Sequence, residues 1–188
     1  MLMSYLDEWE IAIERTRRFN LTLPSLPGMT GRLFDEKRQS EFPYVVREAL
    51  GELEAEDLAA QCLSIHYRLA PIIEQWLGCP VAYTLGWVDD ESENGLFRFG
   101  DAFIEETLNK PIAPGSSVKI HAWLTLPSME IIDASLATSF SKAHHKPEWE
   151  GLVLTKHADE LKGMAYKPVL VGDDFLHKAG LLHSFITL

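Results

Sequence analysis

The chain has 188 residues, enough to bury a substantial core as one domain. Its hydrophobic fraction of 46% and charged fraction of 24% are typical of a globular protein and not of a disordered one. The formal net charge of -11 argues against general affinity for nucleic acid or anionic membranes, because polyanions would be repelled by most of the surface. No stretch approaches the roughly 18 apolar residues of a membrane span. Residues 1–18 carry charges throughout and lack the pattern of a secretory signal peptide, so we expect a cytoplasmic location or export without a cleaved signal.

The first 58 residues are expected to form a helical N-terminal part. A helix is predicted over 1–19, with four apolar residues at helical spacing on one face. Prolines and glycines over 20–31 predict a loop. A second helix is predicted over 41–58, weakened or divided at Gly51. The four residues of the first helix are Leu2, Leu6, Trp9 and Ile13.

Residues 62–77 show the clearest periodicity, with apolar residues on one stripe that predicts a helix packed on a core. Gly78 is the expected helix stop, and Pro71 should kink the helix or break it. Residues 54–61 could also be helical, so the sequence leaves open whether the helix begins at Cys62 or earlier.

Antiparallel strands are expected after this helix. Alternating residues predict a strand over 80–88, a polar turn over 89–95 and a further strand over 96–103. Residues 118–126 predict a strand that contains His121, and Pro127 and Ser128 turn the chain into a returning strand over 129–133. The remaining expectations are loop with short helix over 134–150, a short buried strand over 169–171, and an apolar end at Phe185, Ile186 and Leu188. Helices followed by such a sheet give an α+β fold in one domain, 1–188.

A cysteine, a histidine and an acid occur in an order that suits nucleophilic catalysis. Cysteine attacks as the thiolate, which a helix N-terminus and a nearby histidine stabilise. A carboxylate can hold the imidazole in one orientation and tautomer. Cys62 opens the apolar helix, His121 lies on a strand, and Asp133 lies on the strand that returns across the hairpin. We therefore predict a catalytic triad of these three residues.

The motifs around these residues resemble those of a known superfamily. His121-Ala122-Trp123 followed across a short turn by Ile131-Ile132-Asp133 looks like the histidine and aspartate motifs of transglutaminase-like, papain-related cysteine enzymes. Cys62 with its helix, followed by residues 77–81 and a strand, is similar to that superfamily's nucleophile segment. The resemblance covers roughly residues 60–136. It implies a papain-like (transglutaminase-like) fold, with the catalytic helix packed on an antiparallel sheet, and amide or thioester chemistry through an acyl-enzyme.

Two further roles can be predicted near the triad. The backbone N–H of Cys62 is the natural donor for the oxyanion, and the Gln61 side chain is a second candidate. Side chains alternate along a strand, so Trp123 points to the same side as His121 and is predicted to wall the cleft.

Plain structural roles remain open for the same residues. Cys62 could be an inert core thiol, His121 a satisfied buried histidine and Asp133 the cap of a turn. Cys79, between a helix stop and a strand, is predicted to be structural. His66 shares the helix face of Cys62 and is a weaker candidate base, because the geometry within one helix is poor. We predict no metal site, because the spacing of the remaining histidines (His144, His145 and His157) favours no ligand set.

Together these features predict a cysteine hydrolase, an amidase or peptidase that acts on an amide or isopeptide bond of a peptide or protein substrate without a cofactor. A bacterial toxin or effector acting on cell-wall peptide or a host protein is one setting that fits. The alternatives are an acyl- or amine-transferase of the same fold and a non-catalytic binding module that retains the fold. No nucleic-acid or membrane partner is expected, and the oligomeric state cannot be read from the sequence.

Overall fold

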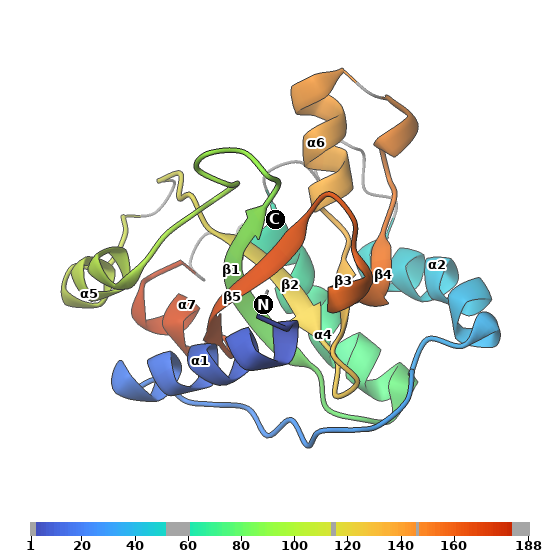
Figure 1. The fold of residues 1–188 in the computed structure, drawn as a ribbon, viewed down its shortest axis with the longest axis horizontal. Helices are drawn as coiled ribbons and strands as arrows, with labels where there is room; N and C mark the ends of the chain where they lie inside the picture. The colour runs from blue at the N-terminus through green and yellow to red at the C-terminus, as the bar shows by residue number, and fades with distance from the viewer. Residues whose placement is uncertain (1–2, 52–60, 114–115, 146, 182–188) are drawn as a thin grey trace. The chain divides into compact units, whose positions relative to one another are not determined.

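The computed structural model describes residues 3–51, 61–113, 116–145 and 147–181 (Figure 1). Its strands hydrogen-bond in the order β4-β3-β2-β1-β5, and the chain combines this antiparallel sheet with helices, so the predicted α+β class is confirmed. Residue contacts divide the chain into two compact units. The single-domain organisation stays a prediction. Unit 1 comprises Met1–Pro24, Thr84–His121 and Leu161–Leu188, and unit 2 comprises Ser25–Tyr83 and Ala122–Glu160.

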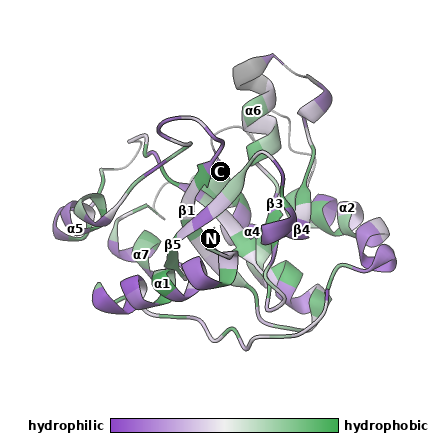
Figure 2. Cartoon of the chain, viewed as in Figure 1, coloured by the Kyte–Doolittle hydropathy of each residue, from purple (hydrophilic) through white to green (hydrophobic). Residues whose placement is uncertain are grey.

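In unit 1, helix α1 (Tyr5–Arg18) lies along strand β5 (Figure 1). Ser4 begins it with a capping box, in which its side chain and that of Asp7 each satisfy a backbone N–H. The Thr16 hydroxyl accepts a hydrogen bond from the Val171 N–H at 2.9 Å and so fixes the helix to the strand. Figure 2 shows α1 as mostly hydrophilic, which fits a helix with one buried face.

The helix at the N-terminus is confirmed, and its buried face matches the apolar face read from the sequence only in part; Leu2 lies outside the described residues. The buried residues are Tyr5, Trp9, Ala12 and Thr16. Of the predicted face, Trp9 is buried and Leu6 is 48% exposed. The sequence carries apolar residues on more than one side of this helix, and the strand selects the side where the smaller Ala12 and Thr16 permit close packing.

Strands β1 (Ala82–Asp89) and β5 (Ala165–Val171) pair antiparallel in unit 1. The prediction of a strand over 80–88 is confirmed, whereas the strand predicted over 169–171 is longer than expected. Pro168 lies inside β5, opposite Gly86, next to a register irregularity. Because β5 is at the edge of the sheet, the missing proline N–H costs no ladder hydrogen bond on the open side.

The strand predicted over 96–103 is wrong. Leu96 makes one antiparallel bridge with Val88, and the chain then enters helix α5 (Asp101–Asn109) after Gly100. Helix α7 (Asp174–Lys178) follows β5, and the Asp174 carboxylate accepts the Thr22 N–H at 2.7 Å. Burial raises the pKa of Asp174, but this hydrogen bond and Lys178 outweigh it and hold that pKa below its ordinary value.

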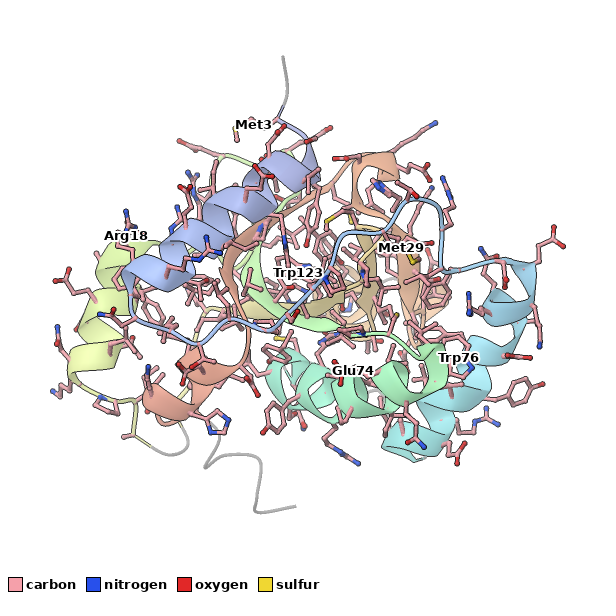
Figure 3. All side chains as sticks on the ribbon, turned by 90° about the horizontal axis from the view of Figure 1, so that it is seen from below. Met3, Arg18, Met29, Glu74, Trp76 and Trp123 are labelled. Atoms are coloured by element: carbon pink, nitrogen blue, oxygen red, sulfur yellow. The ribbon has the colours of Figure 1, made fainter. Side chains whose placement is uncertain are left out.

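In unit 2, helices α2 (Glu36–Leu50) and α4 (Cys62–Leu77) pack against each other. Trp76 points toward α2 (Figure 3), and its ring lies 5.8 Å from each of the rings of Phe34 and Phe42. Helix α2 begins five residues before the predicted start and ends at Gly51, which has a positive φ of 73°. The rest of the predicted helix, residues 52–60, lies outside the described residues.

The prediction for α4 is confirmed at both ends, and the helix continues through Pro71. Gly78 ends it in the left-handed conformation, as expected for a helix stop. The Glu74 carboxylate then accepts the Val81 N–H at 2.9 Å, which directs the chain from the helix into β1. Because Gln61 is not helical, Cys62 is the first residue of α4.

The predicted hairpin is confirmed by strands β2 (His121–Thr125) and β3 (Glu130–Asp133), which pair Leu124 with Ile132. Met129 closes the turn with a positive φ of 60°. Strand β4, which was not predicted, pairs with β3. The remaining elements of unit 2 are β4 (Leu154–His157), α6 (Leu136–His144) and two short 3₁₀ helices, η1 (Pro147–Trp149) and η2 (Ala158–Glu160).

The Glu130 carboxylate fastens this hairpin to the segment before α2. It is 2% exposed and accepts the N–H groups of Leu33 at 2.6 Å and Phe34 at 3.2 Å. It also accepts the Ser128 hydroxyl at 2.6 Å. Hydrogen bonds to a charged carboxylate are among the stronger ones in proteins, so this contact holds the start of β3 in place. Within the described ranges, no helix combines the length and apolar character needed to cross a bilayer.

Candidate functional site

Cys62 occupies the first position of α4, a helix of 16 residues. Gln61 makes no side-chain cap, and the first turn contains no acidic residue. The first helical hydrogen bond runs from the Ile65 N–H to the Gln61 carbonyl at 3.0 Å, so the N–H groups of residues 62–64 precede it. The N-terminal end of a helix carries a partial positive charge. The residue is 9% exposed.

The Ser64 hydroxyl orients the side chain of Gln61. The Ser64 hydroxyl lies 3.1 Å from the Gln61 carbonyl oxygen and 3.3 Å from its side-chain Oε1. The second contact leaves the side-chain amide nitrogen of Gln61 as the group suited to donate to an oxyanion. This role for Gln61 stays a prediction.

Cys79 offers a contrast to Cys62 within the same unit. Both cysteines are free thiols, and Cys79 is partly exposed after the end of α4. Burial raises the pKa of Cys79; Arg38 lowers it and Glu74 raises it further by their charges. The Cys79 thiol is therefore less ionised near neutrality than an ordinary cysteine.

Asp133 ends β3 and is fully buried. Its Oδ1 accepts the N–H groups of Ser135 and Leu136, each at 2.9 Å, and the Ser135 hydroxyl at 3.1 Å. These bonds fix the carboxylate and cap the turn that leads into α6. Asp133 therefore caps a turn, which is the structural role that the sequence left open for it. Its catalytic role stays a prediction.

His66 is a residue whose importance the sequence analysis underestimated. It is fully buried, and its Nδ1 lies 2.8 Å from the Cys62 carbonyl oxygen. The Ala134 N–H donates to its Nε2 at 3.0 Å. Because Nε2 accepts, the proton is on Nδ1, and this nitrogen donates to Cys62. The ring is therefore a neutral bridge between the first turn of α4 and the end of β3.

This arrangement argues against His66 as the base. Its Nε2 lies 3.6 Å from the Asp133 Oδ1, but the lone pair on Nε2 already accepts the Ala134 N–H. The signal in the sequence was the spacing of four residues between Cys62 and His66, which places both side chains on one helix face. That spacing did not indicate the contact with Ala134, which is distant in the sequence.

His121 is the first residue of β2 and is 1% exposed. In unit 1 its ring stacks on Phe97, with centroids 5.3 Å apart and planes at 22°, and lies 6.2 Å from the ring of Tyr166. Trp123 is fully buried (Figure 3) and shares the strand face of His121 by alternation. Its role as the wall of a cleft stays a prediction.

Among the described residues, no group of three or more His, Cys, Asp or Glu is arranged to hold a metal ion. His157 instead accepts the Asp159 N–H at 3.3 Å.

Comparisons with known proteins give no relative: no family model, curated protein or solved structure matches the chain. The chemistry of the side chains therefore carries the functional argument.

Proposed function

We propose that the protein is a cysteine hydrolase of papain-like (transglutaminase-like) architecture that cleaves an amide or isopeptide bond. Cys62 is the nucleophile, His121 the base, and Asp133 the group that orients His121. The observation that carries the proposal is the position of Cys62 as the first residue of α4, at a helix start without a side-chain cap. Such a position combines backbone N–H donors and the positive end of the helix dipole at the sulfur.

The strand register supports the assignment of the other two residues. Leu124 pairs with Ile132, so the strands that carry His121 and Asp133 are neighbours in the sheet. His121 is two residues from Trp123 and shares its strand face. The neutral, fully hydrogen-bonded His66 leaves His121 as the better candidate for proton transfer.

The proposed reaction has two steps. His121 accepts the thiol proton, and the Cys62 sulfur attacks the substrate carbonyl while the N–H of Cys62 and the Gln61 side chain stabilise the oxyanion. The C–N bond then breaks, and His121 returns the proton to the leaving amine, which gives a thioester. Water, deprotonated by His121, attacks the thioester and releases the acid and the free thiol. If an amine replaces water, the same steps give a transferase.

The substrate class follows from this chemistry as a peptide or protein. The two candidate substrates are a cell-wall peptide and a host protein, with the chain acting as a bacterial toxin or effector. A non-catalytic binding module that retains the fold is the outcome if Cys62 proves unreactive.

Alkylation by iodoacetamide tests the proposal, with Cys79 as a thiol control in the same chain. At pH 7 we expect Cys62 to be labelled about tenfold faster than Cys79 or more, because only the ionised sulfur reacts. The Cys79→Ser variant should retain the fast labelling, and the Cys62→Ser variant should lose it. The His121→Ala variant, or His121→Asn if alanine prevents folding, should label more slowly. Equal, slow labelling of the two cysteines would identify a binding module instead.

A further inference from the structure

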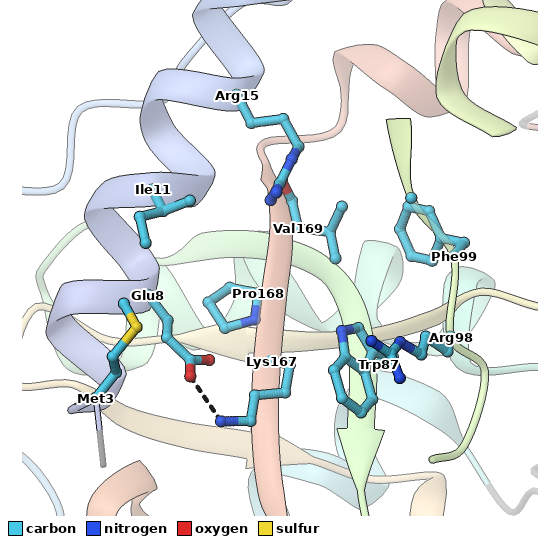
Figure 4. Close-up of a pocket in the computed structure, with 11 residues that line it drawn as sticks. Met3, Glu8, Ile11, Arg15, Trp87, Arg98, Phe99, Lys167, Pro168 and Val169 are labelled. Atoms are coloured by element: carbon cyan, nitrogen blue, oxygen red, sulfur yellow. Dashed lines mark hydrogen bonds and ion pairs between the residues drawn. The ribbon is translucent and has the colours of Figure 1, made fainter. Parts of the chain in front are cut away.

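An open pocket of about 660 Å³ lies within unit 1, and none of the predicted triad residues lines it (Figure 4). One wall comes from α1 and the residue Met3 before it, another from the end of β1, the segment 98–100 and β5. A volume of this size is typical of small-molecule sites. Its charged and aromatic lining includes Glu8, Arg15, Trp87, Arg98 and Lys167.

Two of the three cations in the pocket have a carboxylate partner. The Lys167 Nζ lies 2.6 Å from the Glu8 carboxylate, the contact drawn as a dashed line in Figure 4. Arg15 donates to Asp101 at 2.9 Å and to the Val169 carbonyl at 3.5 Å. Asp101 also pairs with Arg18, so one carboxylate serves two arginines and the α1 side of the pocket keeps some positive charge.

Arg98 is the cation that remains. Its guanidinium lies 4.7 Å from the centroid of the Trp87 ring and has no carboxylate within salt-bridge distance among the described residues. Stacking on an aromatic face leaves the N–H groups at the edge of a guanidinium directed outward, in the geometry that suits a carboxylate. Arg98 is exposed on the pocket wall, and in a chain of net charge -11 an arginine with no carboxylate partner in the described ranges points to an anionic ligand.

The local backbone holds the arginine and its aromatic support in place. Val88 and Leu96 exchange two backbone hydrogen bonds, of 3.0 and 2.7 Å, next to Trp87 and Arg98. Gly95 packs so closely on the Trp87 ring that a Cβ there would lie 2.5 Å from a ring carbon. The pair is therefore preorganised by the chain that connects β1 to α5, which lowers the entropy cost of binding.

The rest of the lining is apolar. Met3 and Ile11 remain 51% and 42% exposed at the α1 side, although they face a pocket that also contains Phe99 and Pro168. Large exposed apolar side chains around a concave site often mark a ligand surface.

We propose that this pocket binds an organic monocarboxylate with a compact aromatic or aliphatic body. The Arg98 guanidinium, which has no carboxylate partner in the part of the chain that the structure describes, suits the two oxygens of a carboxylate, and the apolar wall matches the body. None of the three triad residues lines the pocket, and the proposal goes beyond the hydrolase activity.

Calorimetry with the whole chain and 3-phenylpropionate as the probe tests this proposal. We expect saturable 1:1 binding, a loss of about tenfold or more for Arg98→Gln because a charge-assisted pair is removed, and no comparable loss for Arg17→Gln. Arg17 is an exposed arginine of α1 that does not line the pocket. The neutral amide of the probe should bind much more weakly than the acid.

Three results would overturn it: no binding at millimolar probe, equal binding of the acid and its amide, or equal affinity of the two arginine variants. Tighter binding of phenyl phosphate than of the carboxylate would refute the preference for a carboxylate. Circular dichroism of Arg98→Gln shows whether the variant is folded; if it is not, Arg98→Lys, which keeps the charge but loses the planar fork, should show the weakened binding.

Discussion

Replacing His66 by alanine should destabilise the protein strongly, although His66 is not assigned to catalysis. The change would leave the buried Ala134 N–H without the acceptor that now lies at 3.0 Å, at a cost of roughly 1–3 kcal/mol. The ring is 0% exposed, so its removal also loses packing, which we set at about 2 kcal/mol by comparison with other large-to-small core changes. The Cys62 carbonyl loses the Nδ1–H contact as well. The total is a loss of about 3–5 kcal/mol in the free energy of unfolding.

Urea unfolding at pH 7.5, followed by circular dichroism, measures this loss. His177→Ala is the matched control, because the His177 side chain is 54% exposed and lies 3.8 Å from the Asp173 carboxylate. We expect the control to change stability by less than about 0.5 kcal/mol. If His66→Ala cost no more than His177→Ala, the assignment of His66 as a buried bridge between α4 and β3 would be wrong.

Three further predictions concern other contacts. Glu130→Gln should lower the free energy of unfolding in urea by about 2–3 kcal/mol, because a carboxylate that accepts buried N–H groups is lost. The exposed control Glu160→Gln should lower it by under about 1 kcal/mol. Equal losses would show that the Glu130 contacts do not hold the hairpin. The lowered pKa of Asp174 contributes stability that is present above about pH 4 and lost at lower pH, so the gap between wild type and Asp174→Asn should narrow on acidification through that range; a gap independent of pH would contradict this. Ser4→Ala should cost about 1 kcal/mol by loss of the α1 cap, and an unchanged thermal midpoint would argue against it.

Local patterns predicted much of the fold. Helix α4 was placed at its observed bounds because its apolar stripe ends at Gly78, whose left-handed conformation stops a helix. The β2–β3 hairpin followed from Pro127 and Ser128 between two apolar runs. These features depend on residues close together in the chain, which is why the sequence sufficed.

Tertiary contacts decided the features that were missed. The aromatic residues of 96–99 suggested a strand, but the chain turns at Gly100 into α5. Pro168 argued against a strand over most of β5. A proline is tolerated there because β5 is at the edge of the sheet, which the sequence does not reveal. In the candidate site, the contact of His66 with Ala134 crosses 68 positions and has no local signature. The positions of Cys62, His121 and Asp133 on a helix start and two strands were predictable, whereas their hydrogen-bond partners were not.

Formation of an acyl-enzyme is the direct test of Cys62 as the nucleophile. Mixing the protein with p-nitrophenyl acetate should release one nitrophenolate per chain in a rapid burst, as the ester C–O bond breaks and a thioester forms on Cys62. Intact-mass analysis should then detect one acetyl group, peptide mapping should locate it on Cys62, and the Cys62→Ser variant should lack the burst while Cys79→Ser keeps it. Nitrophenolate release without a burst, or an acetyl group on another residue in the wild-type chain, would contradict the assignment of Cys62 as the nucleophile.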